Sequence, residues 1–141
     1  MRIFMAFLAV IFVPAALAAH SERLGDIRVG HIWAPPTEES GVAVYVPLMN
    51  MGDAPAHLAA VESPIAESAG LREGQGEAAE PIESLELLPN QPISLAEWRV
   101  HIWLEGLDRP LEEGDRFPIK LHFEPQGVVE IDVFVETSPG H

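Results

Sequence analysis

The chain has 141 residues, with 22 Asp and Glu against 8 Lys and Arg, and a formal net charge of -14. This length is typical of one domain, and such an excess of negative charge disfavours binding to a nucleic-acid phosphate backbone. Cys is absent, which excludes disulfides, thiolate metal sites and Cys nucleophiles in this sequence. A bound metal would therefore need His, carboxylate, Met or amine ligands.

The first nineteen residues have the pattern of a secretory signal. Arg2 precedes an apolar stretch that ends at Val13, and Pro14 and a run of Ala and Leu follow. A charged start, an apolar centre and small residues before the cleavage point are typical of exported proteins. The stretch is at the short limit for a membrane span, and no positive cluster follows it. We expect residues 1–19 to be a signal peptide.

Two cleavage sites satisfy the preference for small residues. Ala16 and Ala18 at positions −3 and −1 leave Ala19 as the mature N-terminus, whereas Leu17 with Ala19 leaves His20. The Ala-x-Ala rule favours the first site. The second site would create an N-terminal His, so both remain open at this stage.

Beyond the signal, apolar residues alternate with polar ones at a spacing of two, which predicts strands with one buried face. The strongest runs are Ile27–Trp33, Val42–Leu48, Trp98–Leu104, Phe117–Phe123 and Val129–Val135. In the third run, Trp98, Val100, Ile102 and Leu104 are expected to share the apolar face. The pattern predicts an all-β, single-domain β-sandwich over residues 20–136.

Turn-forming residues separate the expected strands. Pro125, Gln126 and Gly127 predict a hairpin between the last two strands. The segment 62–80 is rich in Glu, Ala, Gly and Ser and is expected to be a loop with a helical turn, and residues 137–141 are expected to form a flexible tail.

Nucleotide-binding, hydrolase and metalloprotease motifs are absent from the sequence. Acidic residues are plentiful, but Glu130, Asp132 and Glu136 fall on the outward parity of a strand, as solvated charges do. No carboxylate pair stands out. We therefore expect a protein that is not an enzyme.

Among the six His, two are candidate ligands within the expected strands. His101 and Trp103 are expected to project together from the face opposite Ile102 and Leu104. His31 shares the parity of Val29 and is expected to be partly buried. The other three within or after the strands, His57, His122 and His141, are expected to be surface residues.

Short motifs follow one another along the chain in a recognisable order. They are Val29–Ala34, Gly41–Gly52 (ending in Asn-x-Gly), Leu58–Pro64, Pro81–Pro89, His101–Leu107 and Pro110–Asp115. In these motifs the region from Leu24 to Val135 resembles the periplasmic copper chaperone family PCu(A)C. The resemblance implies a cupredoxin-like Greek-key β-sandwich and delivery of copper to a periplasmic or membrane copper enzyme.

The same resemblance implies a Cu(I) site built from a His, a Met and a later His-x-Met. In this sequence the corresponding positions hold Arg72, Ala79, His101 and Trp103, so His101 alone is retained. Soft thioethers suit Cu(I), and no Met occurs after Met51. Cu(I) binding by the family's ligand set is therefore not expected.

Two interpretations follow from this departure. In the first, cleavage before His20 exposes a terminal His whose amine and Nδ1 chelate one metal, and a second imidazole completes a histidine brace. Nitrogen ligands in a tetragonal arrangement select Cu(II). The second imidazole is expected to be His101, with His31 in reserve, and Asp26 or Glu22 is an axial candidate. In the second interpretation the protein is a metal-free periplasmic interaction module on the same fold.

Overall fold

The computed structural model describes residues 22–137, so the expected signal peptide and His20 lie outside the described residues. The described region is all-β, as predicted. Its strands are β1 (Glu22–Leu24), β2 (Ile27–Val29), β3 (Trp33–Ala34), β4 (Gly41–Val44), β5 (Val46–Asn50), β6 (Ala56–Glu62), β7 (Ala66–Glu73), β8 (Glu80–Ile82), β9 (Leu85–Leu87), β10 (Ile93–Leu95), β11 (Val100–Leu107), β12 (Arg116–Glu124) and β13 (Gly127–Val135). One 3-10 turn, η1, spans Gly76–Ala78.

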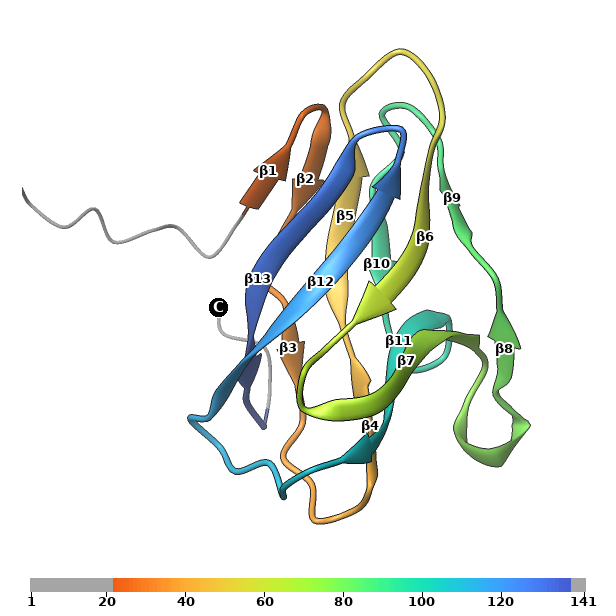
Figure 1. Cartoon of the computed structure of the whole chain (residues 1–141). Coiled ribbons are helices and arrows are strands. Elements are labelled where there is room, and N and C mark those ends of the chain that lie inside the picture. The colour runs from red at the N-terminus through yellow and green to blue at the C-terminus, as the bar shows by residue number, and fades with distance from the viewer. Residues whose placement is uncertain (1–21, 138–141) are drawn as a thin grey trace, which may run out of the picture.

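The strands form three hydrogen-bonded sheets, which make up a single sandwich (Figure 1). Their orders are β1-β2-β5-β10, β4-β11-β7-β8 and β3-β13-β12-β6-β9. Only Tyr45 separates β4 from β5, so the two four-stranded sheets are joined by one chain segment. In Figure 1, β12 and β13 lie in front of β5 and β10. Strands β2, β3 and β13 lie toward one side of the molecule, and β7, β8 and β11 toward the other.

The core lies between these sheets and is made of the residues whose alternation predicted it. In β12, Phe117, Ile119, Leu121 and Phe123 are at most 4% exposed. Ile102 and Leu104 of β11 are completely buried. Each large aliphatic side chain buried in this way contributes roughly 1.5–3 kcal/mol. Hydrophobic burial therefore fixes which face of each strand points outward, and with it the positions of the polar side chains.

The predicted hairpin at the end of the chain is confirmed. Strands β12 and β13 are antiparallel from Arg116↔Phe134 to Phe123↔Gly127. Glu130 and Asp132 of β13 are exposed, as the alternation predicts. Strand β13 also pairs in parallel with β3, through Phe134↔Trp33 and Val135↔Ala34. This second pairing joins segments about a hundred residues apart, and it sets the surroundings of His31.

The prediction that segment 62–80 is a loop is wrong for Ala66–Glu73, although the expected helical turn is present as η1. Strand β7 runs through it and pairs with β11 over nearly its whole length. Leu71 is the one buried residue of this strand, and the others are small or charged. A strand with so little apolar alternation gives no period-two signal, because its conformation depends on the partner strand and not on its own side chains.

The prediction from alternation is also wrong for Trp98. It was expected on the apolar face with Ile102 and Leu104, but its side chain is 73% exposed. The backbone makes a turn just before β11, where the Arg99 N–H donates to the Ala96 carbonyl and the Ala96 N–H to the Val100 carbonyl. The period-two register therefore begins at Val100 and does not extend back to Trp98.

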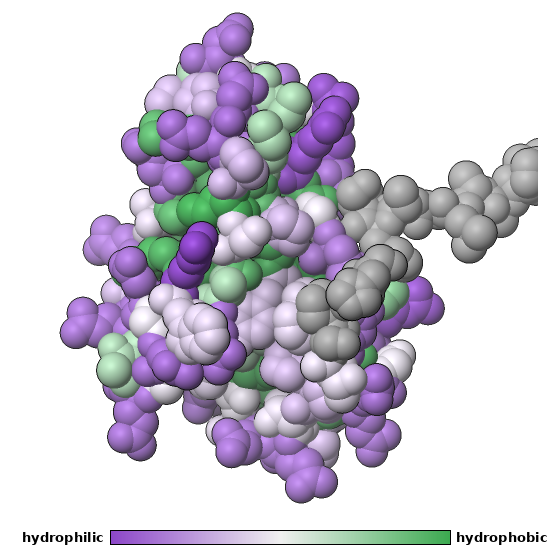
Figure 2. Space-filling view, turned by 180° about the vertical axis from the view of Figure 1, so that it is seen from behind, coloured by the Kyte–Doolittle hydropathy of each residue, from purple (hydrophilic) through white to green (hydrophobic). Residues whose placement is uncertain are grey.

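The surface is mainly polar. Figure 2 shows hydrophilic residues over most of one face, with a band of hydrophobic surface across its upper half. The large apolar side chains that are substantially exposed are Met51, Leu88, Trp98 and Val128. Within residues 22–137, no helix has the length and hydrophobicity that crossing a bilayer requires.

Candidate functional site

The four positions at which the resemblance implies copper ligands lie around one cavity. Arg72 comes from β7, Ala79 follows η1, and His101 and Trp103 come from β11. Together with Gly76 and Glu77 they line a cavity of about 490 Å³. The antiparallel register pairs His101 with Arg72 directly. The four residues that the sequence comparison assigned to the family's ligand positions therefore lie close together in the fold.

The side chains at these positions do not fit a Cu(I) ion. The guanidinium carbon of Arg72 lies 4.4 Å from the centroid of the Trp103 ring, a cation–π contact. Arginine stays charged and has no lone pair to donate to a metal, and the side chains of Ala79 and Trp103 supply no ligand atom. His101 alone is not a binding site. The family's copper position has been replaced here by a stacked cation and an aromatic ring.

His101 is nevertheless held in a defined orientation. It lies on the face opposite Ile102 and Leu104, as predicted, but is only 5% exposed. Its Nδ1 lies 3.1 Å from the Arg99 carbonyl oxygen. Because a carbonyl only accepts, Nδ1 carries the hydrogen in this bond, which leaves the lone pair on Nε2. Metal-ligating His residues are oriented in the same way, but here the cross-strand neighbour is a cation.

The ring of Tyr45 packs near His101, with their centroids 6.3 Å apart in an edge arrangement. The Trp33 ring also packs against Tyr45, with centroids 5.1 Å apart in a tilted arrangement. Burial, and to a lesser degree the charge of Glu97, raises the pKa of the Tyr45 phenol. The three side chains form an aromatic row that extends from β3 to β11.

His31 lies in a different environment, beside a carboxylate. Its Nε2 is 3.1 Å from both carboxylate oxygens of Glu136, which follows β13. Its ring packs against Phe134 at 5.3 Å. Both members of the pair are about a quarter exposed. The prediction that His31 is partly buried is confirmed. The Glu136 carboxylate lies within hydrogen-bonding distance of its ring.

Sequence reasoning assigned Glu136 to the solvated acids and proposed Asp26 or Glu22 as the carboxylate near a metal. Glu22 is exposed at the end of β1, and Asp26 or Glu22 as an axial ligand stays a prediction. The parallel pairing of β3 with β13 brings Glu136 to His31. Short-range alternation carries no information about that pairing.

The two candidate imidazoles are not brought together. His101 lies on β11 beside β7, whereas His31 contacts Phe134 and Glu136 at the end of β13. Strands β7 and β13 lie toward different sides of the molecule (Figure 1). No cluster of three or more His, Asp or Glu residues suited to a metal exists within the part of the chain that the structure describes.

The remaining described His residues make ion-pair contacts on the five-stranded sheet. His57 lies 3.6 Å from Glu86, and His122 lies 3.5 Å from Glu62. His57 is exposed, as expected, and the His122 side chain is 31% exposed. Each is a single imidazole beside a single carboxylate, and neither has a further ligand.

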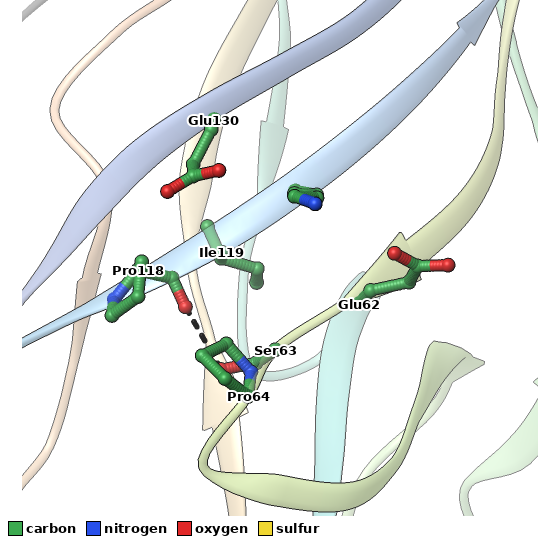
Figure 3. Close-up of a pocket in the computed structure, with 7 residues that line it drawn as sticks. Glu62, Ser63, Pro64, Pro118, Ile119 and Glu130 are labelled. Carbon is green, nitrogen blue, oxygen red and sulfur yellow. Dashed lines mark hydrogen bonds between the residues drawn. The ribbon is translucent and has the colours of Figure 1, made fainter.

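A second cavity, of about 420 Å³, lies on the outer side of β12 (Figure 3). Lys120 lies in register between Glu62 and Glu130 on the neighbouring strands. The Ser63 hydroxyl donates to the Pro118 carbonyl at 2.9 Å, which fixes the edge of this cavity. Its charged side chains alternate in sign, so it offers no concentrated charge to a ligand.

Comparison with known proteins identifies the fold. The model of a family described as "LpqE-like: Putative lipoprotein LpqE-like" matches residues 26–135. None of the curated proteins matches the chain. The matched residues run from just before β2 to the end of β13, and so include both candidate His residues of the described region.

Solved structures share the same sandwich. The chain is 28% identical to the apo PCuAC domain from PmoF1, over 84% of this chain and 100% of that one, with a TM-score of 0.73. It is 26% identical to the copper-bound PCuAC domain from PmoF2, over 84% and 99%, with a TM-score of 0.73. The solution structure of CuI-DR1885 from Deinococcus radiodurans is 21% identical over 86% and 84%, with a TM-score of 0.66, and that likeness shows the fold alone. The PCuAC-type fold predicted from the motifs is thereby confirmed.

Proposed function

The chain belongs to the LpqE-like family and has the PCuAC fold, and on this premise we propose that it is a non-enzymatic copper-binding chaperone that works outside the cytoplasm. Structural relatives described as copper-bound or CuI forms support the copper. The signal-like residues 1–19 support export to the periplasm. Its partners are then the copper ion and a periplasmic or membrane copper enzyme that receives it.

In this proposal the metal is Cu(II), bound by nitrogen ligands. Signal cleavage before His20 provides the terminal amine and the Nδ1 of that residue, and a second imidazole completes the brace. The cavity around His101 does not supply the family's His/Met set, because Arg72 and Trp103 occupy it. A site with amine and imidazole ligands favours Cu(II) among divalent ions.

The charges beside the two candidate imidazoles carry the choice of partner. His31 lies 3.1 Å from both carboxylate oxygens of Glu136, whereas His101 pairs across the strands with Arg72. A carboxylate attracts a metal cation, and an arginine repels it. His20 itself lies outside the described residues. This difference in charge favours His31 as the second imidazole, although the sequence pattern alone favoured His101.

The His31–Glu136 pair also has the spacing of two ligands on one ion. Two ligands in adjacent positions, each about 2.0–2.1 Å from a metal, lie roughly 2.8–3.0 Å apart. Nε2 of His31 and the Glu136 oxygens lie 3.1 Å apart. A metal ion placed between them would replace the hydrogen bond of this pair, and Glu136 would then add a carboxylate to the brace.

The proposal is tested on protein processed from its own signal. Intact mass fixes the mature N-terminus, and Cu(II) titration followed by electron paramagnetic resonance reports nitrogen ligation. We expect a terminus at His20 and one nitrogen-ligated Cu(II) per chain. A matched protein that begins at Ala19 lacks the N-terminal His chelate and should lose that signal. A natural terminus at Ala19, or equal binding by both proteins, would remove the brace.

The same titration decides the second candidate function, a metal-free interaction module. The Arg72–Trp103 contact favours this alternative, because it fills the family's metal position with a cation and an aromatic ring. If the protein with His20 at its terminus binds neither Cu(II) nor Cu(I), the module is the better description.

A further inference from the structure

The cavity between β7 and β11 contains an arginine without a carboxylate partner. Arg72 lines the cavity with Glu77, His101 and Trp103. Within residues 22–137, no carboxylate oxygen lies within 4.0 Å of its guanidinium, although the protein has 22 acidic residues. The described arginine that does form an ion pair is Arg109, which is exposed and binds its neighbour Asp108. The half-buried guanidinium of Arg72 is therefore available to bind an anion.

The Trp103 ring is held in place against the guanidinium of Arg72. Its Nε1 donates to a Glu105 oxygen at 3.1 Å, and its ring lies 4.4 Å from the guanidinium carbon of Arg72. Gly41 on the adjacent strand makes room for the ring, because a Cβ there would lie 2.4 Å from Trp103 Cζ2. An arginine stacked on an aromatic face keeps its N–H donors for a planar anion.

His101 adds a second polar group to the same cavity. Its Nδ1 donates to the Arg99 carbonyl, so in this tautomer its Nε2 is an acceptor and the donors to a carboxylate come from Arg72. Ala79 and Gly76 also line the cavity, and because they are small they leave room in it for a ligand. A volume of about 490 Å³ is within the range that holds a small organic molecule.

We propose that this cavity binds the carboxylate of a small organic acid, with Arg72 as its bidentate partner and Trp103 as the wall for its apolar part. A monoanion fits better than a phosphate dianion. A single arginine offers one positive charge, Glu77 shares the cavity, and the net charge of -14 repels additional negative charge. The site needs no copper, so it stands or falls separately from the proposed metal function.

The test is a titration of the metal-free mature protein at constant ionic strength. Metal is removed on a chelating resin, since chelators such as EDTA are themselves carboxylates. Sodium benzoate, acetate and inorganic phosphate are added in separate arms, and the indole N–H signal of Trp103 is followed by NMR, with Trp103→Phe identifying the peak. We expect a saturable shift with benzoate, a weaker one with acetate, and the weakest with phosphate.

Arg72→Met should lower the affinity for benzoate by about tenfold or more, because a charge-assisted bidentate contact is lost. The matched control is Arg116→Met, which removes a different arginine near an aromatic ring, 5.6 Å from Phe134, and changes the net charge equally. It should leave benzoate binding unchanged. Circular dichroism establishes that both variants are folded, and Arg72→Gln replaces Arg72→Met if that variant is not.

Three results would overturn the proposal. The first is the absence of any saturable shift with benzoate or acetate. The second is equal loss of affinity in the Arg72 and Arg116 variants, which would indicate a general effect of charge. The third is tighter binding of phosphate than of either carboxylate, which would assign the cavity to a different class of anion.

Discussion

At the scale of single residues, three substitutions separate this protein from the copper ligand set that its family resemblance implies. Arg72, Ala79 and Trp103 surround the retained His101 in one cavity. The cation over the indole ring makes the position unfavourable for a metal ion through direct charge repulsion. The backbone around it, including the His101↔Arg72 register, is still that of the family fold.

Because the positions are adjacent in space, restoring the ligands should restore Cu(I) binding there. We predict that the triple variant Arg72→His, Ala79→Met and Trp103→Met competes for Cu(I) with a chromophoric chelator, whereas the unaltered cavity does not. Measuring both with His20 also replaced by Ala removes any contribution from the N-terminus. If the triple variant still fails to compete, these four positions do not form one metal site.

Tyr45 provides a spectroscopic test of the aromatic row that extends from β3 to β11. It is the only Tyr in the chain, and its pKa is raised above 10.0, first by burial and then by Glu97. Since the neutral phenol is favoured in the fold, this contribution to stability is complete below the unfolded pKa near 10 and is lost as pH rises through the folded pKa. Ultraviolet titration of the folded protein should give a midpoint above that of the protein in denaturant. Coinciding midpoints would contradict the burial of the phenol.

At the scale of elements, sequence patterns predicted the strands that bury one face and missed those held by their partners. Strand β12 alternates along its whole length and was identified. Strand β7 buries only Leu71 and was taken for a loop, although it forms one wall of the cavity at Arg72. The exposed Trp98 shows the opposite error, in which an apolar side chain in a turn was added to a strand.

The close approach of β4 to Trp103 on β11 gives a prediction for these elements. In Gly41→Ala, the new Cβ would meet the Trp103 ring and Glu105 at 2.4 and 2.3 Å, so the rigid ring must move. We expect a loss of roughly 1–3 kcal/mol in the free energy of unfolding, measured with urea. Gly70→Ala is the matched control, because Gly70 pairs with Trp103 on β7 and has nothing within 4 Å of an added Cβ. Equal stability of the two variants would mean that Trp103 is not confined by β4.

At the scale of the whole molecule, the sandwich was predictable because its core follows period-two patterns and its motifs occur in the order of a known family. The cavity at His101 was predictable to the same extent, since the motif positions of Arg72, Ala79, His101 and Trp103 translate into a single place in the fold. The contact between His31 and Glu136 was not. It depends on a parallel pairing of β3 with β13, across nearly the whole domain, that leaves no local mark in the sequence.

We propose that copper is held on the β13 side by His20 and His31 and not in the cavity at His101. The most direct measurement is the Cu(II) paramagnetic resonance spectrum of mature protein beginning at His20, with His31→Ala and His101→Ala compared under identical conditions. We expect His31→Ala to lose an imidazole nitrogen from the Cu(II) spectrum and to bind copper at least about tenfold more weakly, as expected for a lost ligand. His101→Ala should keep both the spectrum and the affinity. Loss of the signal in His101→Ala with an unchanged His31→Ala would contradict it.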